Sequence, residues 1–212
     1  MDSPRPSSSP SRSASQFILA SSSPRRRELL ESAGFTFSIY SSAVEELQGH
    51  ELPPKEIAVQ NARLKCLDIL WTHPADVILA ADTVVILDQK LYGKPADMEE
   101  ATAMLKALSG RIHEVVTAVC IGIHGARRSE FFETTRVKFR KLSPESIPAY
   151  LQRINPLDKA GAYAAQDDNG EIIEQTEGSL SNVIGLPLRQ VKETLDRHFN
   201  IRPNRKAHID IF

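Results

Sequence analysis

The stretch from residue 17 to 34, FILASSSPRRRELLESAG, contains a strand-like run, a turn and a helix-like run in immediate succession. The apolar residues Phe17 to Ala20 predict a short buried strand, and the three serines that follow predict a turn. Pro24 to Ala33 is predicted as a helix, because Ser23 suits the N-cap position and Gly34 follows the expected end. A strand that runs directly into a helix is typical of α/β proteins.

The rest of the chain continues this alternation of strand-like and helix-like segments. Two long β-rich runs around a turn at His124–Gly125 predict an antiparallel hairpin, so the sheet is expected to be mixed. We therefore expect an α/β fold in which helices flank a mixed, twisted sheet in two lobes. The predicted helices are 54–71, 98–108, 148–153 and 187–198, and the predicted strands are 35–40, 77–81, 84–87, 115–123, 131–139, 172–173 and 183–184.

The length and composition predict one globular domain with two polar ends. The chain has 212 residues, of which 41% are apolar and 25% charged, and we expect the domain to span residues 16–202. Ten of the first fifteen residues are Ser or Pro, so residues 1–15 are expected to form a disordered extension. Residues 203–212 are mostly polar and are expected to form a C-terminal tail.

Charge and cysteine content exclude several classes of partner. The formal net charge is −1, which argues against a duplex nucleic-acid partner, because such binding needs a strong basic excess. No apolar run approaches the roughly 20 residues that span a bilayer, so no membrane partner is expected. Cys66 and Cys120 lie in apolar segments without metal-binding spacing, which predicts core residues in a reducing compartment, and we expect a cytoplasmic protein.

The serine-rich turn before the first helix is a candidate anion site. Helix N-termini present free N–H groups and a positive dipole end. The hydroxyls of Ser21, Ser22 and Ser23 add donors, and the guanidinium groups of Arg25 and Arg26 suit phosphate oxygens. The alternative is an ordinary N-cap followed by a solvated basic turn. No GxxxxGK[ST] motif occurs, so this is not a Walker loop.

Asp82 and Lys94 are candidates for the chemistry itself. Asp82 is expected at the carboxyl end of a buried strand, where α/β folds place catalytic groups, and it could hold Mg²⁺ or activate a water. The alternative is a turn-capping aspartate. Lys94 stands between Gly93 and Pro95, which fixes its backbone, and it could neutralise a phosphate or simply belong to a turn. The DxD pair of a haloacid-dehalogenase-type phosphatase is missing around Asp82.

Three further polar residues are weaker candidates. Glu46, in the pair Glu45–Glu46, could bring a carboxylate to a metal, although adjacent carboxylates also occur as plain surface charge. Lys65 lies on a predicted helix, where it could equally belong to a solvated face. Gln166 follows a segment of small residues and offers donors and an acceptor that suit a nucleobase edge, unless the segment is an ordinary glycine turn.

Seven short motifs occur in order between Phe17 and about Phe199, and together they resemble the Maf (septum-formation) family of nucleotide pyrophosphatases. The resemblance implies a fold akin to that of inosine triphosphate pyrophosphatases. It also implies hydrolysis of a nucleoside triphosphate to monophosphate and pyrophosphate with a divalent metal, Mg²⁺ or Mn²⁺, by a homodimer. The motifs are ILASSSPRR, the pair EE, ADTVV, GKP, LSGRIHEVVTAV, LDKAGAYAAQ and VIGLPL.

The resemblance also implies roles for individual residues. Asp82, Lys94 and Arg26 would be catalytic, with Asp82 as the base for the attacking water. Glu46 and Asp82 would lie at the metal, and Gln166 would contact the base. The residues implied to grip or neutralise the phosphates are Ser21, Arg25, Arg26, Lys65 and Lys94, and Ser23 is a further substrate-binding candidate of the same turn.

The version of the motif at Asp158–Gln166 is similar to that of family members that act on dTTP and UTP. The chain departs from the usual pattern at Ala164, where a glycine is common, and this bears on base preference more than on the reaction. Three alternatives follow: a pyrophosphatase for 7-methyl-GTP or another modified nucleotide, a non-catalytic nucleotide-binding regulator of cell division, and a phosphomonoesterase. The missing DxD disfavours the last.

Overall fold

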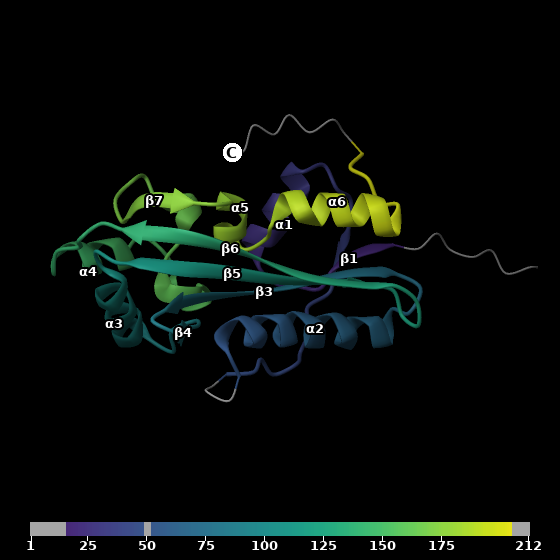
Figure 1. Ribbon diagram of the computed structural model, residues 1–212, viewed down its shortest axis with the longest axis horizontal. Helices are drawn as coiled ribbons and strands as arrows, with labels where there is room; N and C mark the ends of the chain where they lie inside the picture. The colour runs from purple at the N-terminus through teal and green to yellow at the C-terminus, as the bar shows by residue number, and fades with distance from the viewer. Residues whose placement is uncertain (1–15, 49–51, 205–212) are drawn as a thin grey trace, which may run out of the picture.

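The computed structural model describes residues 16–48 and 52–204, which are built around a seven-stranded mixed sheet with the order β2-β1-β3-β5-β6-β7 and β4 against β3 (Figure 1). β1 pairs with β2 and β3 in parallel, and the remaining pairings are antiparallel. The mixed α/β fold predicted from the sequence is therefore confirmed. The strands are β1 (Phe17–Leu19), β2 (Ser38–Ile39), β3 (Val77–Leu87), β4 (Lys90–Tyr92), β5 (Ile112–Gly122), β6 (Arg128–Phe139) and β7 (Ile173–Glu177).

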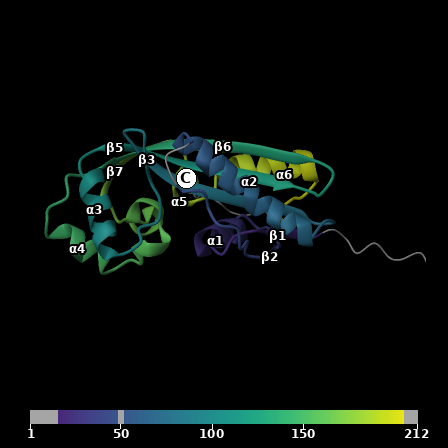
Figure 2. The same ribbon diagram turned by 90° about the horizontal axis from the view of Figure 1, so that it is seen from below.

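Helices cover both faces of this sheet. α2 packs on one face, and α1 and α6 pack on the other, while α3 and α4 lie together at one end (Figure 1 and Figure 2). Each group of helices buries its own cluster of apolar side chains against the strands. The helices are α1 (Pro24–Ser32), α2 (Pro54–Thr72), α3 (Met98–Leu108), α4 (Ser146–Leu151), α5 (Leu180–Ile184) and α6 (Leu188–Phe199), with 3₁₀ turns at Pro156–Asp158, Ala160–Ala162 and Ala165–Asp167.

Within the described residues, two strands pair with the two ends of one edge of β3 and leave the middle of that edge without a neighbouring strand. β1 pairs with Val77–Leu79, and β4 pairs with Val85–Leu87, whereas β5 follows β3 along its other edge from Ile78 to Ile86. Residues 80–84 therefore lie between the ends of β1 and β4. The chain leaves the sheet from both strands at this point, through residues 20–23 and 93–97, so side chains near the centre of β3 can reach a cleft from either face.

One strand prediction is wrong in a way that matters for function. Segments 77–81 and 84–87 form a single strand, so Asp82 lies in the middle of β3 and not at its carboxyl end. Burial of a carboxylate in a strand is costly unless it is paired and hydrogen-bonded, and Asp82 obtains its partners from α2. The strand therefore continues through the polar residues 82–83.

Two shorter strand predictions are also corrected. Segment 183–184 belongs to α5, because the Ser179 hydroxyl accepts a hydrogen bond from the Asn182 N–H and starts a helical turn that overrides the β-branched pair. Segment 35–40 is reduced to Ser38–Ile39, since its partner β1 offers only three residues at the edge of the sheet.

Other expectations fall partly or wholly outside the structure. The extension 1–15 and most of the tail, residues 205–212, lie outside the described residues.

Cys66 and Cys120 are free and buried, as predicted for core residues. Within residues 16–48 and 52–204, none of the helices combines the length and apolar character that crossing a membrane requires.

His113 of β5 is buried in an aromatic cluster at the α3–α4 end of the sheet. Its Nε2 lies 2.9 Å from the Tyr163 hydroxyl, and its ring packs edge-on against Phe139 at a centroid distance of 4.8 Å. Burial lowers the pKa of His113 to about 4, because the charged imidazolium would lose its water.

We expect His113 to make unfolding depend on pH. The pKa of His113 falls from 6.5 to about 4 on folding. Its contribution to the free energy of unfolding is therefore fully present above pH 6.5 and is lost as the pH falls toward 4. The slope is at most about 1.4 kcal/mol per pH unit. We expect the free energy of unfolding, measured with urea across this pH window, to depend less steeply on pH in His113→Gln than in the wild type. The same slope in both proteins, or an equal change in the exposed-residue control His198→Gln, would contradict the assignment.

Candidate functional site

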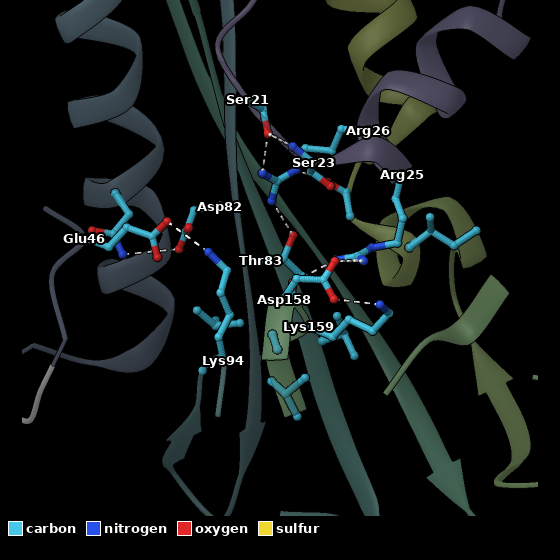
Figure 3. Close-up of a pocket in the computed structure, with 18 of the residues that line it drawn as sticks. Ser21, Ser23, Arg25, Arg26, Glu46, Asp82, Thr83, Lys94, Asp158 and Lys159 are labelled. Carbon is cyan, nitrogen blue, oxygen red and sulfur yellow. Dashed lines mark hydrogen bonds and ion pairs between the residues drawn. The ribbon is translucent and has the colours of Figure 1, made fainter. Parts of the chain in front are cut away.

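A cavity of about 600 Å³ opens where β1 and β4 diverge from β3. Its walls include the β1–α1 turn, the loop before α2, α2 itself, the centre of β3, the segment after β4 and the chain around residues 158–165 (Figure 3). Residues of β4, α3, β5 and the end of α5 complete the lining. The volume lies in the usual range for pockets that bind small molecules. Polar and charged side chains gather in it, and they divide into groups on the two faces of β3.

The first group is centred on Asp82, whose side chain points to the α2 face. Asp82 Oδ1 accepts a hydrogen bond of 2.6 Å from Lys65 Nζ, and Oδ2 accepts one of 3.3 Å from Asn61 Nδ2. All three residues are buried. Asn61 and Lys65 are four residues apart on α2, so they project from one helical face toward the same carboxylate.

Glu46 brings a second carboxylate to the same lysine from the loop between β2 and α2. Its Oε1 lies 2.8 Å from Lys65 Nζ and 3.4 Å from Lys94 Nζ. Burial alone would raise the pKa of Glu46, but hydrogen bonds and charge from the two lysines hold it below its ordinary value. Glu46 is therefore ionised at neutral pH, and Figure 3 shows Lys94 pointing toward its carboxylate.

Arg26 forms the second group, on the opposite face of β3. Its Nε donates to the Gly185 carbonyl (2.9 Å), Nη1 to Ser21 Oγ (3.1 Å) and Nη2 to Thr83 Oγ1 (3.0 Å). Burial lowers the pKa of Arg26, and the charge of Asp82 partly offsets this effect. A guanidinium has five N–H donors, so two remain for a ligand in the cavity that Arg26 lines.

A hydrogen bond between two threonine hydroxyls orients the Thr83 oxygen that accepts from Arg26. Thr83 Oγ1 lies 2.9 Å from Thr117 Oγ1, which in turn donates to the Asn182 carbonyl over 2.9 Å. The single proton of Thr117 is used in that bond, so Thr83 donates to Thr117 and presents a lone pair to Arg26. The guanidinium is thereby held in one orientation before any ligand arrives.

Arg25 and Asp158 form a third group across the cavity. Arg25 Nη1 lies 3.0 Å from Asp158 Oδ2, and Arg25 Nη2 donates to the Asp158 carbonyl over 3.1 Å. Lys159 Nζ lies 2.7 Å from Asp158 Oδ1. Burial would raise the pKa of Asp158, but Lys159 and Arg25 hold it below the ordinary value. Arg25 is thus paired with a carboxylate of the chain, unlike Arg26.

Most of the predicted site residues share this cavity. Two do not fit simply. Ser23 lines the cavity and precedes α1, but its side chain makes no capping bond, and its N–H donates to Ser21 Oγ instead. Gln166 is exposed on the 3₁₀ turn Ala165–Asp167, outside the residues that line the cavity, and its contact with a base stays a prediction. The predicted residues that line the cavity together are Ser21, Ser22, Ser23, Arg25, Arg26, Glu46, Lys65, Asp82 and Lys94.

Sequence reasoning missed several polar residues of the cavity. Asn61 carried one usable signal, its spacing of four residues from Lys65 on a predicted helix. Thr83 carried another, because it follows Asp82 in a strand and must face the other side. Asp158 and Lys159 belong to a segment that the sequence singled out for its small residues, and the ion pair with Arg25 was not foreseeable from spacing.

The acidic side chains of the cavity could take part in binding a cation. The part of the chain that the structure describes holds no group of three or more His, Cys, Asp or Glu side chains placed to bind a metal. Glu46 and Asp82 instead form a pair whose oxygens contact one ammonium group. Two carboxylates bind Mg²⁺-like ions when a phosphate ligand supplies further oxygens.

The chain is similar to known proteins over most of its length. The model of the family described as "Maf-like protein" matches residues 16–198. The chain is 44% identical over 179 residues to the "dTTP/UTP pyrophosphatase" of Akkermansia muciniphila, covering 84% of this chain and 94% of that protein. It is 47% identical over 173 residues to the protein of the same name from Pyrococcus furiosus, covering 82% and 90%.

Among solved structures, a nucleoside-triphosphatase / dITP/XTP pyrophosphatase from Mycobacterium abscessus shares 16% identity and covers 65% of this chain and 93% of its own. The TM-score of this match is 0.37.

We expect Thr83→Val to weaken anion binding in the cavity. The change keeps the shape of the side chain but removes the acceptor that orients Arg26, so the affinity for inorganic pyrophosphate should fall about tenfold, the cost of one hydrogen bond to a charged group. Thr83→Ser should retain the affinity, as should Thr102→Val, a control on α3 outside the cavity. Titration calorimetry measures all four proteins, and an unchanged affinity in Thr83→Val would contradict the role of the hydroxyl.

Proposed function

The chain belongs to the Maf-like family, and we propose that it is a nucleoside triphosphate pyrophosphatase that hydrolyses dTTP and UTP to the monophosphate and pyrophosphate. One observation carries the proposal. A pair of carboxylates, Glu46 and Asp82, faces a fixed guanidinium, Arg26, across a single cavity of about 600 Å³. Such a site offers a base, anchors for a cation and positive charge for a phosphate chain, which together are the requirements of phosphoryl transfer.

A divalent cation, Mg²⁺ or Mn²⁺, fits this donor set. Hard cations take oxygen ligands, and in nucleotide sites they are commonly held by one or two carboxylates and the phosphates of the substrate. Glu46 and Asp82 would hold the ion. When bound, it would draw charge from the phosphate oxygens and make a nearby water more acidic.

Asp82 is assigned as the general base. In the proposed step its carboxylate takes a proton from a water whose oxygen forms a bond to the α-phosphorus. The bond from the α-phosphorus to the bridging oxygen breaks, and the electron pair leaves with pyrophosphate. Lys65 and Asn61 keep the Asp82 carboxylate in place during this transfer.

The cations are assigned to the phosphate chain. Arg26 and Lys94 neutralise the charge that develops on pyrophosphate, while Ser21, Ser23, Arg25 and Lys65 contribute to binding the triphosphate. Arg25 uses two of its five N–H donors on Asp158, so it binds the substrate with the remaining donors while Asp158 offsets its charge. Lys94 is the most exposed of these cations and holds Glu46 at 3.4 Å, so it can turn toward a ligand at small cost.

Base recognition and assembly complete the proposal. Ala164 and Ala165 line the cavity, and Gln166 follows them, which supports assigning this segment to the nucleobase with the Gln166 amide at its edge. We assign the protein to the cytoplasm as a homodimer, without duplex nucleic acid as a partner. The net charge of −1 supports the last point.

Product analysis tests the reaction. The purified protein is incubated with Mg²⁺ or Mn²⁺ and with dTTP, UTP, CTP, ITP or 7-methyl-GTP, and pyrophosphate and orthophosphate are assayed separately. We expect pyrophosphate from dTTP and UTP. Pyrophosphate from 7-methyl-GTP alone would reassign the base preference, and orthophosphate alone would indicate a phosphomonoesterase. Nucleotide binding by calorimetry without any product would support the non-catalytic regulator.

Replacement of Asp82 tests the mechanism. Asp82→Asn keeps the shape of the side chain and its contact with Lys65 but removes the base, so kcat for dTTP should fall by about 10²–10⁴-fold. Asp88→Asn is the matched control, because Asp88 is exposed and pairs with Arg111 outside the cavity. Near wild-type turnover in Asp82→Asn would remove Asp82 from the mechanism.

A further inference from the structure

Asn61 is a buried polar residue in the cavity wall to which the comparisons and the sequence motifs assign no role. The residue is only 3% exposed, and its side chain projects from α2 toward the loop that carries Glu46 and toward β3. Burial of a side-chain amide is costly unless its donors and acceptor are used. The contacts of Asn61 therefore indicate what it is there to hold.

Those contacts join two separate parts of the site. Asn61 Oδ1 accepts from the Leu47 N–H over 2.7 Å, and Nδ2 donates to the Leu47 carbonyl over 3.2 Å. Nδ2 also donates to Asp82 Oδ2 over 3.3 Å. One amide thus binds the backbone next to Glu46 and the carboxylate proposed as the base.

The loop before α2 needs such an anchor. Within residues 40–48 and 52–53, the described part of this connection forms no helix or strand. α2 holds its backbone at two points: Asp68 accepts from the Ser42 hydroxyl and the Ala43 N–H, and Asn61 pairs with both backbone groups of Leu47. Lys65 adds a side-chain contact with the Glu46 carboxylate. The contact at Leu47 directly follows Glu46, so it fixes the backbone from which the Glu46 carboxylate reaches Lys65.

The same amide also completes the setting of Asp82. Lys65 takes Oδ1 and Asn61 takes Oδ2, which leaves the carboxyl group little freedom to rotate. The two partners come from neighbouring turns of one helix, so they move together. The positions of Glu46 and Asp82 therefore both depend on contacts with α2.

We propose that Asn61 is a positioning residue that fixes Glu46 and Asp82 relative to each other, an inference that rests on the proposed pyrophosphatase function. It touches neither the phosphate chain nor the reacting water in this assignment. Its loss should therefore affect turnover more than substrate affinity. A merely structural asparagine would change the stability of the protein and leave the kinetics of the folded molecules unaltered.

Hydrogen exchange of the Leu47 amide tests the anchor without any substrate. In the wild type this N–H should be protected, because it donates to Asn61 Oδ1. In Asn61→Leu, which has a similar shape but no polar atoms, protection should fall at least about tenfold. Amides in the middle of α2 should be unchanged, which separates local release from global unfolding. Exchange of Leu47 at the rate of a free peptide in the wild type would overturn the anchor, whether or not the variant folds.

Kinetics test the consequence for the reaction. With dTTP and Mg²⁺, Asn61→Leu should lose at least about tenfold in kcat while KM changes by less than about threefold, because Arg26 and Ser21 bind from the other face of β3. Gln60→Leu is the matched control: it removes a neighbouring amide of α2 whose oxygen contacts Arg63 and not the cavity. Wild-type kcat in Asn61→Leu would overturn the proposal.

Asn61→Asp separates the two contacts of the amide. It keeps an acceptor for the Leu47 N–H but places a negatively charged oxygen against the Leu47 carbonyl and Asp82 Oδ2, so the Leu47 N–H should stay protected while kcat still falls. Full kcat in this variant would overturn the contribution of Asn61 to Asp82. A wild type that releases no pyrophosphate would overturn the proposed function and the catalytic half of this inference, and the exchange data would still decide the anchor.

Discussion

The buried contact between Lys65 and Asp82 constrains how α2 lies on the sheet. A carboxylate in the middle of an apolar strand costs several kcal/mol unless it is paired and hydrogen-bonded. The 2.6 Å contact with Lys65 meets this need only if α2 packs in one register along β3. Small residues make that register possible. Ala58, Ala62 and Cys66 form a buried row on α2, so the helix approaches the strands closely and the adjacent row, with Asn61 and Lys65, reaches Asp82.

The period of a strand explains how one segment serves two opposite kinds of charge. Successive side chains point to opposite faces, so Asp82 meets the ammonium of α2 while Thr83 meets the guanidinium of Arg26 on the other side. A fully paired strand would keep these two environments apart. The interval between the β1 and β4 pairings opens the edge of β3 at residues 80–84, and both environments border one cavity there.

Local signals in the sequence predicted the elements well and the partners of buried groups poorly. The helix at residues 98–108 has the predicted bounds, because its capping aspartate and apolar spacing are both local. The end of a strand was placed before Asp82 because nothing local shows that Lys65, seventeen positions earlier, neutralises it. Arg25 and Asp158 are 133 positions apart, and their pairing depends on the fold as a whole. The sequence thus predicts which residue types lie at the site, but it does not predict which charged side chains are paired with one another.

The contrast between two neighbouring arginines shows why those contacts matter. Arg25 is neutralised by Asp158, and Lys65 is shared by two carboxylates. Arg26 bonds to two hydroxyls and a carbonyl, all uncharged, so its positive charge has no direct counter-ion among the contacts that the described residues provide. Neutral acceptors orient a guanidinium without cancelling its field, and partial burial reduces the screening by water. An anion that enters the cavity gains most from Arg26, because Asp158 already offsets the charge of Arg25. In the proposed reaction, the position of Arg26 would define where the phosphate chain binds, and the carboxylate pair across β3 would define which phosphorus lies next to the base.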